Sequence, residues 1–120
     1  MHQDSFPDGF YLVDSGGASY FTRTILVLRQ GQLFGLGPFG GIYEGDYTFD
    51  PGRKLTTFTG HVTLPPDTPL VTGGKTGAEG LRAPIVSEAK FVAGVPSRCS
   101  FSLGGKSVDL SIRFVRPLPQ

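Results

Sequence analysis

The chain contains little that would support disulfide, metal or membrane chemistry. Its 120 residues include one cysteine, Cys99, no tryptophan, and two histidines, His2 and His61. A lone cysteine excludes a disulfide within the chain, and histidines so far apart do not have the spacing of metal ligands. The chain has no run of about 18 apolar residues, the minimum for a membrane span. We therefore expect no membrane partner, no metal and no cofactor.

The chain also lacks an excess of charge of either sign. Eleven Lys and Arg residues face ten Asp and Glu residues, which leaves a net charge of +1. Proteins that bind nucleic acids usually carry a basic excess on one face, so this balance argues against a DNA or RNA partner. The opening MHQDSFPDGF has neither a basic flank nor an apolar run, which predicts no secretory signal and a cytoplasmic location.

Glycine, proline and aromatic residues are abundant instead. The sequence has 18 Gly, 10 Pro, 10 Phe and 4 Tyr residues, and the aromatic residues recur at strand spacing between the glycines. The clearest example is the segment 42–50, where every second position points to the same side of a strand. One side carries Tyr43, Gly45, Tyr47 and Phe49, and the other carries Glu44, Asp46 and Thr48.

Alternation of this kind, broken by Gly and Pro turns, predicts one all-β domain over residues 1–120. The expected strands are 9–14, 18–29, 33–37, 42–50, 54–64, 85–92, 98–103 and 107–116. Residues 1–8 are expected to form a loose lead-in. Residues 65–84 are expected to form a long loop, with 76–82 the only place for a helical turn. Eight antiparallel strands in a meander favour closure into a barrel, which removes open sheet edges.

The interior of such a barrel allows two interpretations. Eight strands leave a space that side chains fill or that holds one small ligand. The residues expected to fill it are Phe10, Tyr43, Tyr47, Phe49, Phe58, Phe101 and Phe114. In the alternative, the protein carries or senses a small apolar ligand, which would lie against Tyr43, Tyr47, Phe58 and Phe114.

The alternation also places apolar side chains on the outside of the barrel. The predicted outward residues are Phe21, Ile25 and Val27, with Leu36 and Phe39 near the glycine-rich bend. A contiguous apolar patch on the outside of a folded domain usually marks an interface. The sequence therefore predicts a protein that acts through protein–protein contact.

No combination of residues predicts an enzyme. Glu44 and Asp46 are paired carboxylates about 7 Å apart on an outward strand face, where such groups are usually solvated. Cys99 points inward by strand parity, as a small apolar filler does. The stretch Gly74-Lys75-Thr76 resembles the end of a phosphate-binding loop, but Pro69 stands where that motif requires a glycine. We expect no catalytic residues.

Several short stretches also resemble one protein family over the region from Gly9 to Phe114. They are Gly9-Phe10-Tyr11, Leu26-Val27-Leu28 ending at Gly31, Gly35 and Gly37, Tyr43-Glu44-Gly45-Asp46-Tyr47, and Phe101-Ser102-Leu103-Gly104-Gly105. In their order they resemble the GrlR-like family, small negative regulators associated with type III secretion. The resemblance implies a lipocalin-like β-barrel that pairs as a homodimer and regulates through a protein partner.

Overall fold

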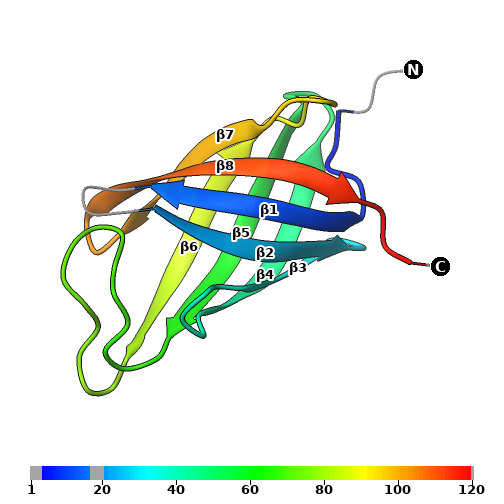
Figure 1. Cartoon of the computed structure of the whole chain (residues 1–120). Helices are drawn as coiled ribbons and strands as arrows, with labels where there is room; N and C mark the ends of the chain where they lie inside the picture. The colour runs from blue at the N-terminus through cyan, green and yellow to red at the C-terminus, as the bar shows by residue number, and fades with distance from the viewer. Residues whose placement is uncertain (1–3, 17–20, 120) are drawn as a thin grey trace.

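The computed structural model describes residues 4–16 and 21–119, which form strands, turns and loops and contain no helix. The predicted all-β architecture is confirmed, and eight antiparallel strands build a nearly closed barrel (Figure 1). The strands are β1 (Gly9–Gly16), β2 (Phe21–Arg29), β3 (Gln32–Leu36), β4 (Ile42–Asp50), β5 (Leu55–Leu64), β6 (Leu81–Ala89), β7 (Ser97–Leu103) and β8 (Lys106–Arg116). The predicted strand 18–29 overlaps β2, and its first residues, 18–20, lie outside the described residues.

The barrel is closed between its first and last strands and open between two consecutive ones. The strand order is β6-β5-β4-β3-β2-β1-β8-β7, so β1 pairs with both β2 and β8. Strands β6 and β7 are the edges of the sheet, and we call the line between them the seam. A side chain bridges the seam, because the Ser87 hydroxyl donates a hydrogen bond of 2.8 Å to the Ser100 carbonyl.

The loop before β6 is shorter than predicted. Strand β6 begins at Leu81 and includes Pro84, which lies opposite His61 of β5, so the expected loop 65–84 ends at residue 80. The expected helical turn at 76–82 is wrong, since this stretch leads directly into the strand. Proline is tolerated in β6 because an edge strand has one side without a neighbouring ladder.

The expected loose lead-in is anchored to the barrel from Phe6 onward. The Phe6 side chain is only 4% exposed, and its ring centroid lies 5.3 Å from that of Phe58 and 5.1 Å from that of Phe91. The carboxylate of Asp8 accepts hydrogen bonds from the Gln30 amide and from the Tyr47 hydroxyl, both at 3.1 Å. This segment therefore closes one end of the barrel.

Phe10 lies on the outside of the barrel, contrary to the prediction. In β1 the buried positions are Gly9, Tyr11, Val13 and Ser15, so Phe10 has the opposite parity and pairs with Val27 on the outer face. Only one of two neighbouring aromatic residues can point inward. Tyr11 takes the inner position because its ring packs 5.3 Å from that of Phe114 and its hydroxyl donates to the Pro7 carbonyl.

Candidate functional site

The outer surface of β2, β3 and β4 carries a row of aligned apolar side chains. The backbone register places Ile25 opposite Leu36, and Leu36 opposite Ile42. These side chains are 55%, 53% and 36% exposed, respectively. Residues paired across antiparallel strands point to the same face, so the three side chains form a continuous apolar line.

A second row widens this line into a surface. Val27 lies opposite Phe34, and Phe34 is 48% exposed. Phe39 is 51% exposed in the turn that connects β3 to β4. We call this surface the apolar face and define it by Ile25, Val27, Phe34, Leu36, Phe39 and Ile42.

The apolar face contains four of the five residues that the sequence predicted for an interface. The fifth, Phe21, belongs to β2, but its side chain lies outside the described residues. Phe34 and Ile42 were not predicted. Each lies on the outward parity of a predicted strand, so the alternation contained the signal, but their place beside Val27 and Leu36 depends on strand register.

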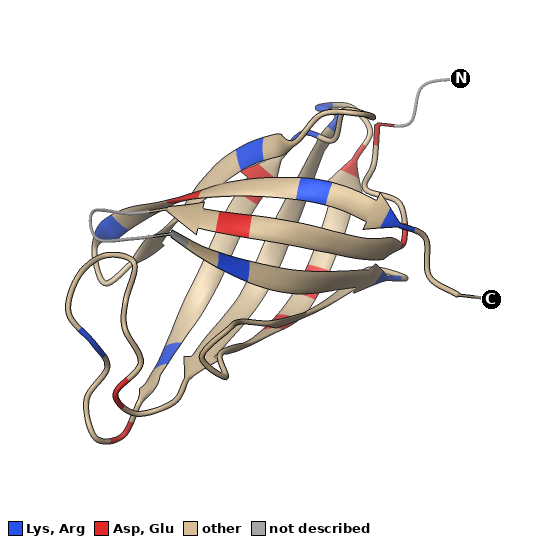
Figure 2. Ribbon diagram, viewed as in Figure 1, with Lys and Arg blue, Asp and Glu red and all other residues tan. Residues whose placement is uncertain are grey.

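A hollow of about 360 Å³ lies next to Phe34 on the same side of the barrel. Val27 and Phe34 contribute to its lining, and the polar residues Arg29, Gln32 and Glu44 contribute to its rim. The apolar face therefore combines a protruding aromatic ring with an adjacent depression. Figure 2 shows that basic and acidic residues are interspersed over the strands, without a continuous run of one sign.

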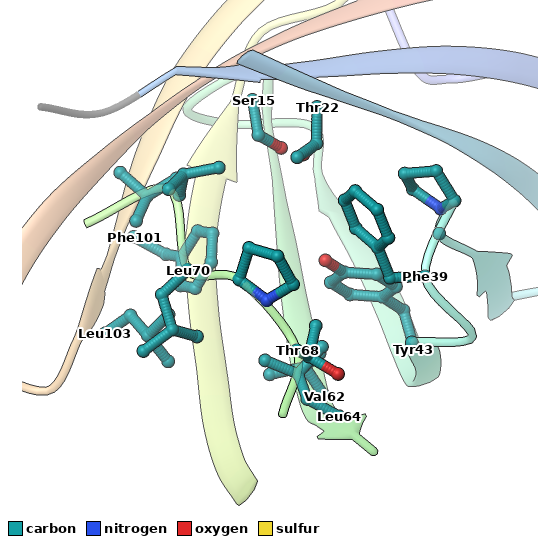
Figure 3. A pocket seen from close by; sticks show the side chains of 16 residues that line it. Ser15, Thr22, Phe39, Tyr43, Val62, Leu64, Thr68, Leu70, Phe101 and Leu103 are labelled. Carbon is teal, nitrogen blue, oxygen red and sulfur yellow. The ribbon is translucent and has the colours of Figure 1, made fainter. Parts of the chain in front are cut away.

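The barrel interior is mostly filled and retains two small voids. One void, of about 70 Å³, lies in the centre and is lined by residues including Phe58, Leu26 and Ile112. The other, of about 50 Å³, lies at the end covered by the 65–80 loop (Figure 3). Tyr43 and Phe101 contribute to both voids, so the two lie next to each other along the barrel.

The four residues predicted to line a ligand site lie in different parts of the barrel. Tyr43 and Phe58 line the voids. The Tyr47 ring lies 5.9 Å from Phe58, but its hydroxyl points to Asp8 at the other end of the barrel. Phe114 packs against Tyr11 at that same end. The structure therefore brings Tyr43 and Phe58 to the central void and leaves Tyr47 and Phe114 in the aromatic packing around Phe6.

The chemically reactive side chains do not converge. Burial raises the pKa of the Cys99 thiol, and a hydrogen bond with Ser87 offsets part of this shift, so the thiol remains in its weakly nucleophilic neutral form. Glu44 and Asp46 are exposed on the outer face, where Glu44 lies opposite His61. Among residues 4–16 and 21–119, no three His, Cys, Asp or Glu side chains are grouped as metal ligands require.

These features define a class of protein: a nearly closed all-β barrel with an apolar outer face and a small capped interior. Comparisons of the chain with family models, with curated proteins and with solved structures found no match. The described part of the chain contains no helix with the length and apolar character needed to cross a membrane.

Proposed function

We propose that this protein is a non-enzymatic β-barrel that acts through protein–protein contact, with the apolar face as the contact surface. The observation that carries the proposal is the alignment of Ile25, Leu36 and Ile42 into one exposed row. Burial of apolar surface contributes about 25 cal/mol per Å². A partner that covers this row would therefore gain stability that the isolated barrel does not have.

A second copy of the chain is the partner that we propose. In a twofold-symmetric pair, the same surface meets itself, so a protrusion and a hollow must lie side by side on each copy. Phe34 and the hollow of about 360 Å³ next to it have this arrangement. A stable interface covers about 800 Å² per partner, which is about a tenth of the 7347 Å² accessible surface of the chain.

The regulatory role and the lipocalin-like character of the barrel are both proposed from the resemblance to the GrlR-like family. In this proposal a homodimer presents its remaining surface to a regulatory protein partner. We propose the cytoplasm as the compartment, which suits the single, partly buried Cys99, because thiols are kept reduced there.

Sedimentation velocity over a wide concentration range tests the contact surface. The wild-type chain of 12.8 kDa is expected to double its mass as the concentration rises into the micromolar range. Leu36→Lys places a charge in the middle of the apolar face and is expected to keep the chain monomeric. The matched control is Val86→Lys, since Val86 is 61% exposed on the edge strand β6, outside the apolar face.

The V86K variant is expected to associate like the wild type. A wild-type chain that stays monomeric at high micromolar concentration contradicts self-association. Equal association of L36K and the wild type would show that another surface is used. Circular dichroism of both variants checks that the barrel is intact, and each substitution is at an exposed position, where the effect on folding is small.

A further inference from the structure

Residues 65–80, which we call the cap, form a compact unit over one end of the barrel. Thr76 donates its amide to the Thr68 carbonyl at 2.9 Å, and Leu70 donates its amide to the Gly74 carbonyl at 3.0 Å. The hydroxyls of Thr68 and Thr76 both donate to the Pro65 carbonyl, at 2.7 and 2.6 Å. These bonds lie within the cap and tie its two arms to each other.

The cap is attached to the barrel mainly by apolar packing. Val71 is 9% exposed and belongs to the apolar cluster that contains Phe101 and Leu103 of β7. A long hydrogen bond also connects the cap to β8, because the Lys106 ammonium donates to the Thr72 carbonyl at 3.4 Å. Because the shorter hydrogen bonds lie within the cap, we expect the cap to move as one body where its apolar packing against the barrel gives way, as a lid does.

The space below the cap is apolar and leads inward. The void of about 50 Å³ is lined by Leu70 and Val71 of the cap and by Phe101 and Leu103, and it adjoins the central void of about 70 Å³. Figure 3 shows Leu70, Phe101 and Leu103 around this space. An apolar cavity of about 150 Å³ holds a benzene molecule. The closed interior is smaller than this, so a larger guest requires Val71 to withdraw.

Lys106 places a positive charge beside this space: it is exposed and pairs with Leu103, which contributes to the lining. Because the Leu103 side chain is buried in the barrel, both residues point to the inner side of the strands. Among the described residues, no carboxylate lies within ion-pair distance of the Lys106 ammonium. Lys75 of the cap, by contrast, is paired with Asp67 at 3.4 Å.

From these observations we infer that the capped end of the barrel binds an aliphatic carboxylate of medium chain length. The chain enters the apolar space that Val71 vacates, and the carboxylate binds the Lys106 ammonium in place of the Thr72 carbonyl. A charge-assisted hydrogen bond of this kind fixes one end of the ligand, while burial of the chain supplies most of the affinity. The site meets the apolar face only at Phe39, which contributes to the lining of the void of about 50 Å³; Ile25, Leu36 and Ile42 are not part of that lining.

Calorimetric titration with octanoate, and with 1-octanol as the uncharged chain, tests this inference on the full chain. Wild-type protein is expected to bind octanoate more tightly than 1-octanol. Lys106→Gln is expected to weaken octanoate binding about tenfold, as loss of a hydrogen bond to a charged group does, and to leave 1-octanol binding unchanged. Lys75→Gln is the matched control, because it removes a charge from the cap while retaining Lys106.

Methyl NMR spectra locate the ligand, and shifts are expected at Val71 and Leu103. Val71→Ala is expected to strengthen octanoate binding, because a smaller side chain must be displaced. The inference is overturned if octanoate gives neither heat nor methyl shifts at millimolar concentration, or if K106Q and K75Q weaken binding equally. Shifts confined to the apolar face would also overturn it. The L36K variant is expected to bind octanoate normally, which separates this site from the proposed contact surface.

Discussion

Gly45 of β4 and Gly60 of β5 lie opposite each other, and the two backbones approach so closely that neither residue has room for a side chain. A Cβ atom on Gly45 would lie 2.6 Å from the Gly60 Cα atom and would overlap the Thr59 carbonyl. A Cβ atom on Gly60 would lie 2.9 Å from the Gly45 Cα atom. The barrel wall therefore depends on glycine at both positions.

Substitution of Gly60 by alanine is expected to destabilise the barrel. The added methyl group meets backbone atoms that cannot rotate away, and overpacking of this kind costs about 1–3 kcal/mol. Urea unfolding measures the change in the free energy of unfolding. Gly77→Ala is the control, since a Cβ atom there meets nothing within 4 Å. Equal stability of the G60A variant and the wild type would contradict the close approach.

Thr56→Val is expected to stabilise the protein. The Thr56 residue is 1% exposed, and its hydroxyl has no hydrogen-bond partner. A buried polar group without a partner costs about 1–3 kcal/mol, and an apolar group of the same shape removes that cost. We expect thermal unfolding to show a higher midpoint for T56V. The control is Thr59→Val, at an exposed position of the same strand, which is expected to change the stability little. A lower midpoint for T56V would show that the Thr56 hydroxyl of the wild type has a hydrogen-bond partner.

The stability of the barrel is expected to fall in alkaline solution because of Tyr11. Burial raises the pKa of the Tyr11 phenol above its ordinary value of 10.0, and electrostatic interactions with Tyr47 and Asp8 raise it further. Above pH 10 the unfolded chain loses this proton while the folded chain retains it. The free energy of unfolding that depends on Tyr11 is therefore fully present below pH 10 and decreases above it. A rise of one pH unit above 10 lowers the free energy of unfolding by about 1.4 kcal/mol.

Urea unfolding at pH 8 and pH 11 measures this loss. The Tyr11→Phe variant cannot ionise at this position, so its stability is expected to fall less between the two pH values. Its stability at pH 8 also changes, because the hydrogen bond to the Pro7 carbonyl is removed. The comparison therefore depends on the slope with pH, and parallel slopes for Y11F and the wild type would refute the assignment to Tyr11.

Phe6→Ala is expected to weaken the barrel strongly. The Phe6 ring packs against Tyr11, Phe58 and Phe91, and truncation of a buried phenylalanine costs about 3–5 kcal/mol. Phe39→Ala is the control, since Phe39 is 51% exposed. Both variants are compared at a concentration where the chain is monomeric. If F6A unfolds at the wild-type temperature, the segment before β1 does not close the barrel end.

The alternation of apolar and polar residues predicted most of the fold, because one face of each strand contacts the core and the other contacts solvent. Strand β4 has the predicted bounds, Ile42–Asp50, and Tyr43 and Tyr47 point inward as expected. Three features had no such signal. Phe6 is a single aromatic residue in a segment without a period, Phe10 and Tyr11 compete for one inner position, and Pro84 is acceptable only because β6 is an edge strand.

The candidate sites were partly predictable for the same reason. Parity placed Ile25 and Leu36 outside, where the structure has them. It could not show that Phe34 joins Val27, because neighbours across strands are set by register. Neither the enclosure of Val71 beneath the cap nor the position of Lys106 beside the capped space has a periodic signature, since both depend on contacts between segments far apart in the chain.

The position of the seam has a consequence for how the chain reaches this shape. The consecutive strands β6 and β7 do not pair with each other, whereas β1 and β8, the first and last strands, do (Figure 1). A circular permutant cut within residues 90–96, with the native ends linked, would place every ladder between successive strands. Its contact order would be lower, so it would fold faster than the parent chain and still form the same sheet.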